Sequence, residues 1–182
     1  MKGCVLWLTG LPSAGKSTIS KIIYDKLKAN GIKVELLDGD EVRKNLSPDL
    51  GFSKADRETH AKRVAYVSKL LARNGVIAIV ALISPYRSFR EAARNSIGDF
   101  VEVFVNAPLE ECIKRDVKGL YKKALAGEIK DMTGIQDKYE EPTEPEITIY
   151  SSKVTPEEAA NSIISKLQEL GYLDRNSISA TA

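Results

Sequence analysis

The chain has 182 residues, a length that fits one domain or at most two small ones. Its 27 lysines and arginines nearly balance its 25 aspartates and glutamates, and the resulting net charge of +2 disfavours general binding to nucleic acid or to a membrane surface. Two cysteines and one histidine exclude a disulfide framework, a four-ligand zinc site and a histidine-rich metal centre.

No segment of the sequence has the character of a targeting signal or a membrane anchor. The apolar stretch 4–11 runs directly into a glycine-containing loop and lacks a small-residue cleavage site. The longest apolar run, residues 76–83, is too short to span a bilayer as a helix. We therefore expect a soluble cytoplasmic protein, which also fits the low cysteine content.

The N-terminal part of the chain alternates between strand and helix patterns. Residues 3–9 are apolar and rich in β-favouring side chains, which predicts a buried strand. Apolar residues at helical spacing after Ser17 predict a helix that stops at Asn30-Gly31. A second strand is expected at residues 33–37, and it leads into the acidic turn Asp38-Gly39-Asp40.

The same alternation continues through the middle of the chain. Ser53 and Asp56 have the spacing of a capping box, which predicts the start of a long helix that ends at Asn74-Gly75. Residues 76–83 are all apolar, as expected for a strand that is buried on both faces. Pro85 suits the first turn of the next helix.

The last third of the chain contains two more strand patterns, at residues 100–105 and 147–150, and a helix is expected to begin at Pro108. Between them, residues 114–145 are charged, contain three glycines and show little periodicity. A long irregular segment inside a compact domain is usually functional, so we expect a mobile basic lid with some helix. Thr155 to Glu158 form a second capping box at the head of a final helix.

Five strand and helix alternations predict an α/β fold: a five-stranded parallel sheet with helices on both faces. One domain is expected over residues 1–174, with a polar tail at 175–182. Ligands of such sheets bind at the carboxyl ends of the strands, so the segments that follow the strands should converge on one site.

The most distinctive of these segments is Gly10–Ser17, which matches the phosphate-binding pattern G-x-x-x-x-G-K-[ST] between a predicted strand and a predicted helix. Its glycines allow the backbone N–H groups to face phosphates, Lys16 would reach the β- and γ-phosphates, and Ser17 would hold Mg²⁺. The alternative is a glycine turn with an exposed lysine. The expected ATP-binding residues here are Gly10, Leu11, Pro12, Ser13, Ala14, Gly15, Lys16, Ser17 and Thr18.

A phosphate-binding loop alone does not distinguish a kinase from a GTPase or a motor ATPase. The sequence has no N-K-x-D motif, which guanine-binding proteins usually carry, and it is too short for a helicase-like apparatus. After the second strand, Asp38 and Asp40 can divide two roles that phosphoryl transfer needs, one at the acceptor hydroxyl and one at the metal. The alternative is an ordinary acidic turn.

Three arginines, together with Lys16, indicate that the acceptor is itself an anion. Arg43 follows the acidic turn, and Arg57 and Arg63 lie on one side of the long predicted helix. His60 lies between them at the same three-residue spacing, where it is either a ligand or an ordinary polar helix residue. Guanidinium groups suit phosphate or sulfate oxygens, although solvated surface arginines are the alternative. These residues alone indicate an enzyme that uses Mg-ATP and phosphorylates a small anionic acceptor.

Phe52 and the lid have two interpretations each. Phe52 follows Gly51 in a loop, where it would either plug the core or stack on a nucleobase. The basic lid would close over phosphates and exclude water, or it would form a solvated helix face. Its cationic residues are Lys114, Arg115, Lys118, Lys122 and Lys123.

Beyond these features, nearly the whole chain, about residues 3–170, resembles the adenylyl-sulfate kinase family. The DGDxVR, GFS, SPY and KGLY motifs of that family are much more specific than the phosphate-binding loop. The matching segments are Trp7–Leu11, Leu37–Arg43, Leu50–Ser53, Asp56-Arg57 with Arg63, Ile83–Tyr86, Arg115–Tyr121, Thr133-Gly134, Tyr139-Glu140 and Pro145-Glu146.

The resemblance implies a P-loop kinase fold and transfer of the ATP γ-phosphoryl group to the 3′-hydroxyl of adenosine 5′-phosphosulfate (APS). The product would be 3′-phosphoadenosine 5′-phosphosulfate (PAPS), within sulfate assimilation. Asp38 would be the acceptor-side base, Asp40 would assist Ser17 at Mg²⁺, and Arg115 would lie against the ATP adenine. The residues implied in APS binding are Asp38, Asp40, Arg43, Phe52, Arg57, His60, Arg63, Ile83, Ser84, Lys118 and Leu120.

The resemblance also implies a homodimer and a possible association with an ATP sulfurylase. Ser84 occupies the position of a serine that has been proposed as a phosphorylated intermediate in the family, whereas direct in-line transfer needs no covalent step. The chain departs from the family pattern at a few positions. His60 stands where asparagine is usual, and its protonation is expected to add a pH dependence near neutrality. The other departures are Lys62, Val117 and Met132.

Two other functions remain open from the sequence. One is another small P-loop kinase, acting on a sugar acid, shikimate or a nucleotide. The other is a regulatory domain that binds nucleotide without turnover and serves a sulfurylase partner. The presence of Lys16, Ser17 and Asp38 argues against the second.

Overall fold

The computed structural model describes residues 2–174, and its centre is a five-stranded sheet in the order β2-β3-β1-β4-β5 with all neighbours parallel. This confirms the predicted sheet. The strands are β1 (Cys4–Thr9), β2 (Val34–Asp38), β3 (Ile77–Ala81), β4 (Phe100–Asn106) and β5 (Ile147–Tyr150). The tail predicted at 175–182 lies outside the described residues.

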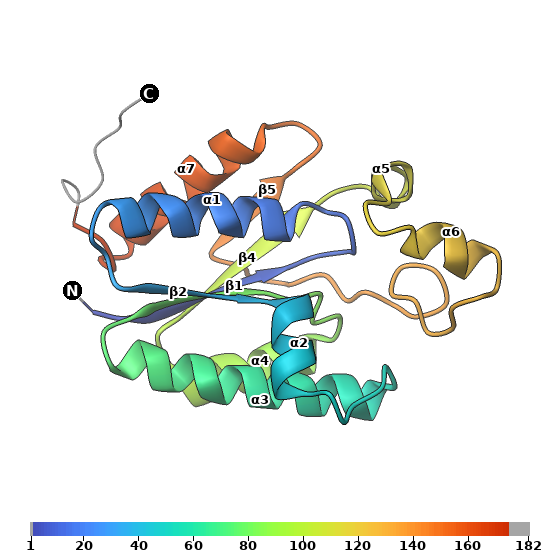
Figure 1. Cartoon of the computed structure of the whole chain (residues 1–182). Coiled ribbons are helices and arrows are strands. Elements are labelled where there is room, and N and C mark those ends of the chain that lie inside the picture. The colour runs from blue at the N-terminus through green and yellow to red at the C-terminus, as the bar shows by residue number, and fades with distance from the viewer. Residues whose placement is uncertain (1, 175–182) are drawn as a thin grey trace.

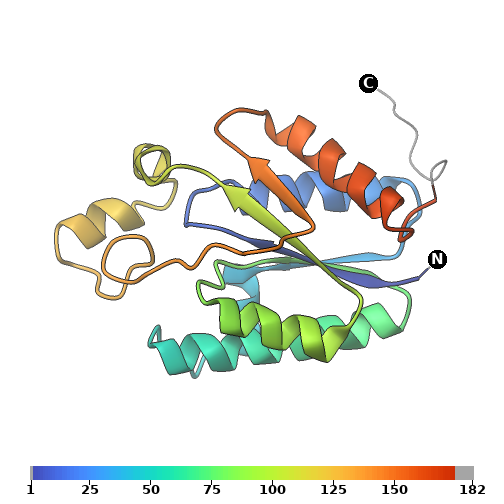
Figure 2. The same cartoon turned by 180° about the vertical axis from the view of Figure 1, so that it is seen from behind.

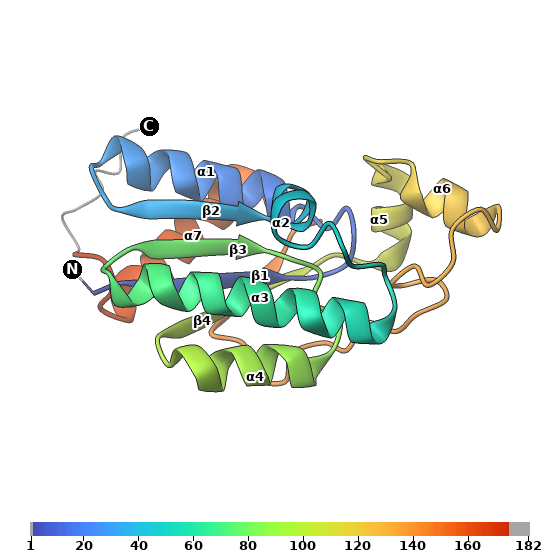
Figure 3. The same cartoon turned by 60° about the horizontal axis from the view of Figure 1, so that its bottom comes forward.

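Helices cover both faces of the sheet, as predicted (Figures 1 and 2). On one face lie α1 (Lys16–Ala29) and α7 (Pro156–Glu169), and on the other lie α3 (Lys54–Arg73) and α4 (Arg87–Ile97). The view from below shows α3 and α4 running alongside the strands on this face of the sheet (Figure 3). Each face therefore has its own apolar core beneath its helices.

Strand β1 separates the two cores, because its successive side chains point to opposite faces. Leu6 and Leu8 belong to the core beneath α1 and α7, whereas Val5 and Trp7 belong to the core above α3 and α4. All residues of β1 and β3 are buried, which confirms that these strands are covered on both faces.

The helix starts follow the predicted capping residues with one exception. Ser53 accepts a hydrogen bond from the backbone of Asp56 at the start of α3, and Thr155 forms a capping box at the start of α7. Helix α4, however, starts at Arg87 rather than at Pro85. The carbonyl of Pro85 accepts a hydrogen bond from the Glu140 backbone, which holds this residue outside the helix.

A short helix that the sequence did not predict, α2 (Gly39–Leu46), begins directly after β2. Asp38 is its N-cap, since its side chain accepts a hydrogen bond from the backbone N–H of Asp40. The expected acidic turn is therefore the point where β2 ends, at Asp38, and where α2 begins, at Gly39. This arrangement places the Asp38 carboxylate at the carboxyl end of β2.

The lid segment projects beyond the carboxyl ends of the strands, on the same side as α2 (Figures 1 and 3). It begins in the last residues of α5 (Leu109–Arg115) and contains α6 (Leu120–Leu125), with turns and bends over most of residues 126–146. The predicted mixture of irregular chain and some helix agrees with this arrangement. None of the helices within residues 2–174 combines the length and apolar character needed to cross a membrane.

Candidate active site

A cleft of about 1020 Å³ opens at the carboxyl ends of the strands. Its walls come from segments that are far apart in the sequence. This agrees with the expectation that the segments after the strands converge on one site. The cleft is lined by residues 12–19, 38–40, 43–44, 52, 57, 60–61, 81–85, 115, 117–118, 120, 129–133, 151, 154–156 and 159.

The floor of the cleft is the phosphate-binding loop between β1 and α1. Gly10 and Gly15 have φ values of 154° and 107°, which side-chain-bearing residues rarely adopt. A Cβ atom on Gly10 would lie 2.3 Å from the carbonyl oxygen of Val105, so only glycine fits there. The loop thus curls tightly and presents the N-terminus of α1 to the cleft.

Lys16 is buried at the start of α1, and its ammonium group donates hydrogen bonds to the carbonyls of Gly10 (2.9 Å) and Leu11 (2.7 Å). Burial lowers the pKa of Lys16 to about 8. Its ammonium group is therefore held inside the curl of the loop, where a phosphate bound to the loop N–H groups would meet it.

Two carboxylates stand opposite the loop, at the junction of β2 and α2. Ser17 Oγ donates a hydrogen bond of 2.6 Å to Asp38 Oδ2, and the Asp40 carboxylate forms an ion pair with Lys118 of the lid. Hydroxyl and carboxylate oxygens are the hard ligands that Mg²⁺ prefers, so this donor set fits the metal that the sequence analysis expects.

Phe52 lies at the edge of the cleft with 59% of its surface exposed, which excludes the interpretation that it plugs the core. Arg43 donates a 2.8 Å hydrogen bond to the Gly51 carbonyl and places its guanidinium 4.5 Å from the centroid of the Phe52 ring. Arg57 donates through Nε to the Phe52 carbonyl at 2.8 Å. Both arginines therefore fix the loop that presents this ring.

Arg57 also joins the long helix to the lid. Its Nη2 donates to the Asp131 carbonyl at 2.7 Å, and its Nη1 donates to Thr133 Oγ1 at 3.2 Å. Arg63 behaves differently, because both of its terminal nitrogens bind the Asp49 carboxylate at 2.6 and 2.8 Å. Arg63 does not line the cleft, so its implied role in substrate binding stays a prediction.

His60 lines the cleft, but only 5% of its surface is exposed to solvent. Its Nδ1 lies 2.9 Å from Ser47 Oγ, and its buried Nε2 has no hydrogen-bond partner among residues 2–174. Burial, together with the positive charges of Arg43 and Arg63, lowers the pKa of His60 to about 4. The expectation of protonation near neutrality was therefore wrong, because the imidazole is neutral there.

Ile83 and Ser84 follow β3 and line the cleft. Ser84 is buried and has a φ of 39°, an uncommon conformation for a residue with a side chain. Its hydroxyl accepts a hydrogen bond of 2.9 Å from Trp7 Nε1, and Thr9 Oγ1 donates to the Ile83 carbonyl at 2.7 Å. Side chains of β1 thus support this loop from below.

The lid contributes only part of its charge to the cleft. Arg115, Lys118 and Leu120 line it, whereas the cleft-lining residues do not include Lys114, Lys122 or Lys123. Arg115 reaches toward the carbonyls of Ser13 and Ala14 at 3.4 and 3.3 Å, so it lies against the phosphate-binding loop.

Sequence reasoning missed the wall of the cleft that follows β5. Ser151 donates a hydrogen bond of 2.6 Å to the Ala14 carbonyl, and Val154, Thr155 and Pro156 continue this wall. These residues directly follow β5, and their position after a strand end could have indicated that they line the cleft. Lys44 and Lys130 also line the cleft without having been singled out.

Comparisons of the sequence with known proteins show one family. The sequence model of the family described as "Adenylylsulphate kinase" matches residues 2–150. The adenylyl-sulfate kinase of Picosynechococcus sp. is 56% identical over 94% of this chain and 97% of its own length. A probable adenylyl-sulfate kinase of Pyrococcus abyssi is 57% identical over 95% of this chain and 99% of its own length.

A solved structure from the same family has a similar fold. The solved structure of the Mycobacterium tuberculosis APS kinase CysC in complex with AMPPNP and APS superimposes with a TM-score of 0.88. That structure is 40% identical to this chain, and the match covers 92% of this chain and 98% of the solved one.

Proposed function

The chain belongs to the adenylylsulphate kinase family, and we propose that its cleft transfers the γ-phosphoryl group of ATP to the 3′-hydroxyl of APS, giving PAPS and ADP. The observation that carries this function is the meeting of a complete phosphate-binding loop with the Asp38 carboxylate, which is hydrogen-bonded to Ser17 of that loop. Donor and acceptor sites therefore share one cleft of about 1020 Å³.

On the donor side, the curled loop binds the ATP phosphates through its backbone N–H groups and the N-terminus of α1. Lys16 moves from its loop carbonyls to the β- and γ-phosphates, where its charge stabilises the transferring group. Arg115, which lies against the loop, borders the nucleotide on the lid side.

Ser17 and Asp40 supply the oxygen ligands that would hold Mg²⁺ beside the phosphates. A bound Mg²⁺ would supply positive charge that offsets the negative charge of the phosphates. The Asp40 carboxylate is paired with Lys118, so it would be available to a metal only after this ion pair opens. Its opening would also free the Lys118 ammonium for an anionic substrate.

On the acceptor side, Asp38 orients the 3′-hydroxyl and accepts its proton as the oxygen attacks the γ-phosphorus in line. We propose direct transfer without a phosphoserine. The Ser84 side chain is buried, and its hydroxyl is already hydrogen-bonded to Trp7, which suits a structural role better than that of a nucleophile.

Phe52 offers an exposed ring on which the adenine of APS can stack, and Arg43 and Arg57 bring positive charge to the phosphosulfate beside it. His60 lines the same cleft, and the buried Nε2 of its neutral imidazole has no hydrogen-bond partner among residues 2–174, so we propose that the acceptor supplies one. The Ile83 and Ser84 backbone and the lid residues Lys118 and Leu120 complete the acceptor wall.

The test is direct detection of the 3′-phosphorylated product from Mg-ATP and APS, with gluconate, shikimate and AMP as parallel acceptors. PAPS from APS alone is the expected result. Product from another acceptor would identify a different small-molecule kinase, and ATP binding without any product would identify a regulatory domain. Either outcome would overturn the proposal.

Two substitutions examine the roles within the cleft. Lys16→Ala and Asp38→Ala should each lower turnover at least about 100-fold, because they remove charge at the transferring phosphoryl group or the base for the acceptor. Lys21→Ala and Asp25→Ala are matched controls, since these residues pair with each other on the exposed side of α1. Normal turnover in Lys16→Ala or Asp38→Ala would contradict the role of that residue.

The setting of the reaction follows from the family and remains a proposal. We propose a cytoplasmic homodimer that acts in sulfate assimilation, beside an ATP sulfurylase that forms its substrate. Gel filtration with light scattering tests the dimer, and co-purification with a sulfurylase tests the association.

A further inference from the structure

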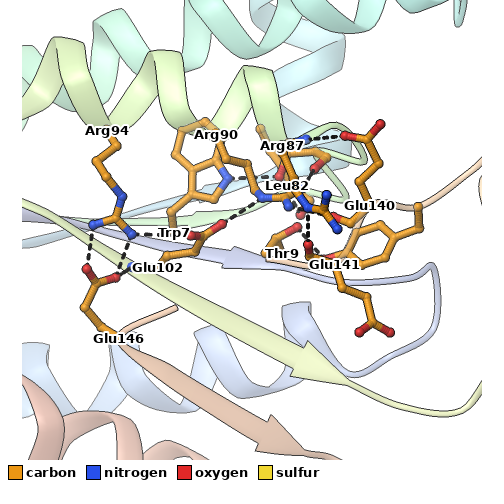
Figure 4. Close-up of polar contacts among 12 residues, drawn as sticks. Trp7, Thr9, Leu82, Arg87, Arg90, Arg94, Glu102, Glu140, Glu141 and Glu146 are labelled. Atoms are coloured by element: carbon orange, nitrogen blue, oxygen red, sulfur yellow. Dashed lines mark hydrogen bonds and ion pairs between the residues drawn. The ribbon is translucent and has the colours of Figure 1, made fainter. Parts of the chain in front are cut away.

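Arg90 and Glu102 form a buried ion pair (Figure 4), and neither residue lines the cleft. Arg90 of α4 is 2% exposed and Glu102 of β4 is 7% exposed. Arg90 Nε donates to Glu102 Oε1 at 2.7 Å. Since burial of two charges is costly even when they are paired, such a pair calls for a specific role.

The other two nitrogens of the Arg90 guanidinium bind backbone carbonyls from two distant segments. Nη1 donates to the Ser84 carbonyl at 2.5 Å, and Nη2 donates to the Glu140 carbonyl at 2.6 Å. Ser84 belongs to the loop that reaches the cleft after β3, and Glu140 belongs to the chain that returns from the lid to β5. One planar group therefore joins both segments to the sheet.

Ser84 has a φ of 39°, a backbone conformation that a residue with a side chain rarely adopts. Such a conformation persists only where surrounding contacts hold it, and the hydrogen bond from Arg90 to the Ser84 carbonyl is one of these contacts. The Trp7 indole holds its hydroxyl, and Arg90 holds its carbonyl. Loss of either contact would let the peptide relax toward an ordinary conformation, and this would move the backbone that faces the acceptor.

The return segment of the lid is fastened to the same loop by its own backbone. Glu140 donates its N–H to the Pro85 carbonyl at 2.8 Å, and its carboxylate accepts from the Arg87 N–H at 2.9 Å. Arg87 Nε also donates to the Glu141 carbonyl at 2.7 Å. The base of the lid and the acceptor loop thus form one unit, which Arg90 attaches to Glu102.

We propose that Arg90 is a positioning residue for the acceptor: its guanidinium, neutralised by Glu102, holds the Ser84 peptide and the base of the lid in the geometry that APS requires. This inference rests on the proposed function. Arg90 touches neither the phosphate-binding loop nor any other cleft wall besides Ser84 through these hydrogen bonds. Its loss should therefore affect the acceptor far more than ATP.

Arg94, one turn further along α4, provides a matched control. It is also paired with Glu102 (3.3 Å) and binds Glu146 at 2.5 and 2.9 Å, but its hydrogen bonds reach neither Ser84 nor Glu140. Arg94→Gln therefore weakens the same network without releasing the acceptor loop. A residue that served stability alone would behave as Arg94 does.

The kinetic test compares Arg90→Lys with Arg94→Gln and the wild type. Lysine keeps the charge next to Glu102 but cannot donate to three acceptors in one plane. We expect kcat/KM for APS to fall about 10- to 100-fold in Arg90→Lys, since small displacements at a reacting site have effects of this size, with KM for ATP changed less than about threefold. The double variant Arg90→Gln/Glu102→Gln avoids an unpaired buried charge and should show the same pattern.

A second readout does not depend on turnover. Trp7 is the only tryptophan of the chain, and its indole N–H is bonded to Ser84, so its fluorescence reports on this loop. Ser84→Ala gives the spectrum of Trp7 without its acceptor. The emission of Arg90→Lys should shift toward that spectrum, whereas that of Arg94→Gln should stay at the wild-type position.

The two proposals fail in different ways. If the wild type makes no PAPS from APS, the proposed function is wrong, whatever the variants do. If the wild type makes PAPS but Arg90→Lys keeps kcat/KM for APS within about twofold of Arg94→Gln, or keeps the wild-type Trp7 emission, the positioning role of Arg90 is wrong. Equal losses for APS and ATP would also overturn it, because they would indicate a general structural role.

Discussion

The buried imidazole of His60 should make the stability of the protein depend on pH in a way that one substitution removes. In the folded chain its pKa is lowered from 6.5 to about 4, first by burial and then by Arg43 and Arg63. As the pH falls below 6.5, the unfolded chain takes up a proton at this position that the folded chain refuses. Proton uptake therefore favours unfolding, and the stability present at neutral pH is lost toward pH 4.

The size of the effect follows from the two pKa values. Between pH 7.5 and pH 5 the wild type should lose about 2 kcal/mol of unfolding free energy through His60 alone, and the loss should approach about 3 kcal/mol at pH 4. His60→Asn has no proton to take up, so it should not show this component. Carboxylates titrate in the same range in both proteins, and their contribution cancels in the comparison.

The assay is urea denaturation of the wild type and His60→Asn at a series of pH values from 7.5 to 5. The difference between the two unfolding free energies should change by about 2 kcal/mol across that range in favour of the variant. His60 is the only histidine, so the NMR signal of its imidazole in untagged protein gives the folded pKa directly. Parallel pH curves for the two proteins, or an imidazole that titrates near 6.5, would refute the reasoning.

Three further outcomes are expected. Phe52→Ala should raise KM for APS about tenfold through lost stacking and leave KM for ATP unchanged, and Tyr66→Ala, whose exposed ring lies outside the cleft, should change neither value in the same steady-state assay. The pKa of Lys16 is about 8, and phosphates bind its protonated form. The value of kcat/KM for ATP should therefore be level below pH 8 and fall above it. A flat pH profile up to pH 9.5 would contradict this. Gly10→Ala should lower the melting temperature and abolish nucleotide binding, because its Cβ would lie 2.3 Å from the Val105 carbonyl oxygen; a melting temperature equal to that of the wild type would show that the loop can yield.

Local patterns predicted much of the fold because each arises from neighbouring residues. The apolar run that became β3 is buried on both faces, and the capping residues Ser53 and Thr155 begin the helices that their spacing predicted. Helix α2 was missed, because only Val42 and Leu46 are large apolar residues in its eight positions and the cap at Asp38 looked like an acidic turn. The helix start at Arg87 was misplaced because a contact with Glu140, far along the chain, holds Pro85.

Some features of the site could likewise be predicted from local sequence patterns, and others could not. The phosphate-binding loop and the two aspartates could be found from their spacing, whereas APS as the acceptor came from a resemblance and not from chemistry visible in single residues. Arg90 was not singled out, because a charged residue on a helix reads as solvent-exposed unless the partner that neutralises it is known. The neutrality of His60 could not be predicted either, since it depends on burial beside Arg43 and Arg63.

The position of β1 has a consequence for redesign. This strand supports both sides of the cleft: it leads into the phosphate-binding loop, its Trp7 indole donates to the Ser84 hydroxyl, and its Thr9 hydroxyl donates to the Ile83 carbonyl. Substitutions in β1 would disturb donor and acceptor together. A kinase with a new acceptor is therefore better sought in the Phe52 loop and in residues 129–133 of the lid, where the cleft wall can be exchanged without altering the central strand.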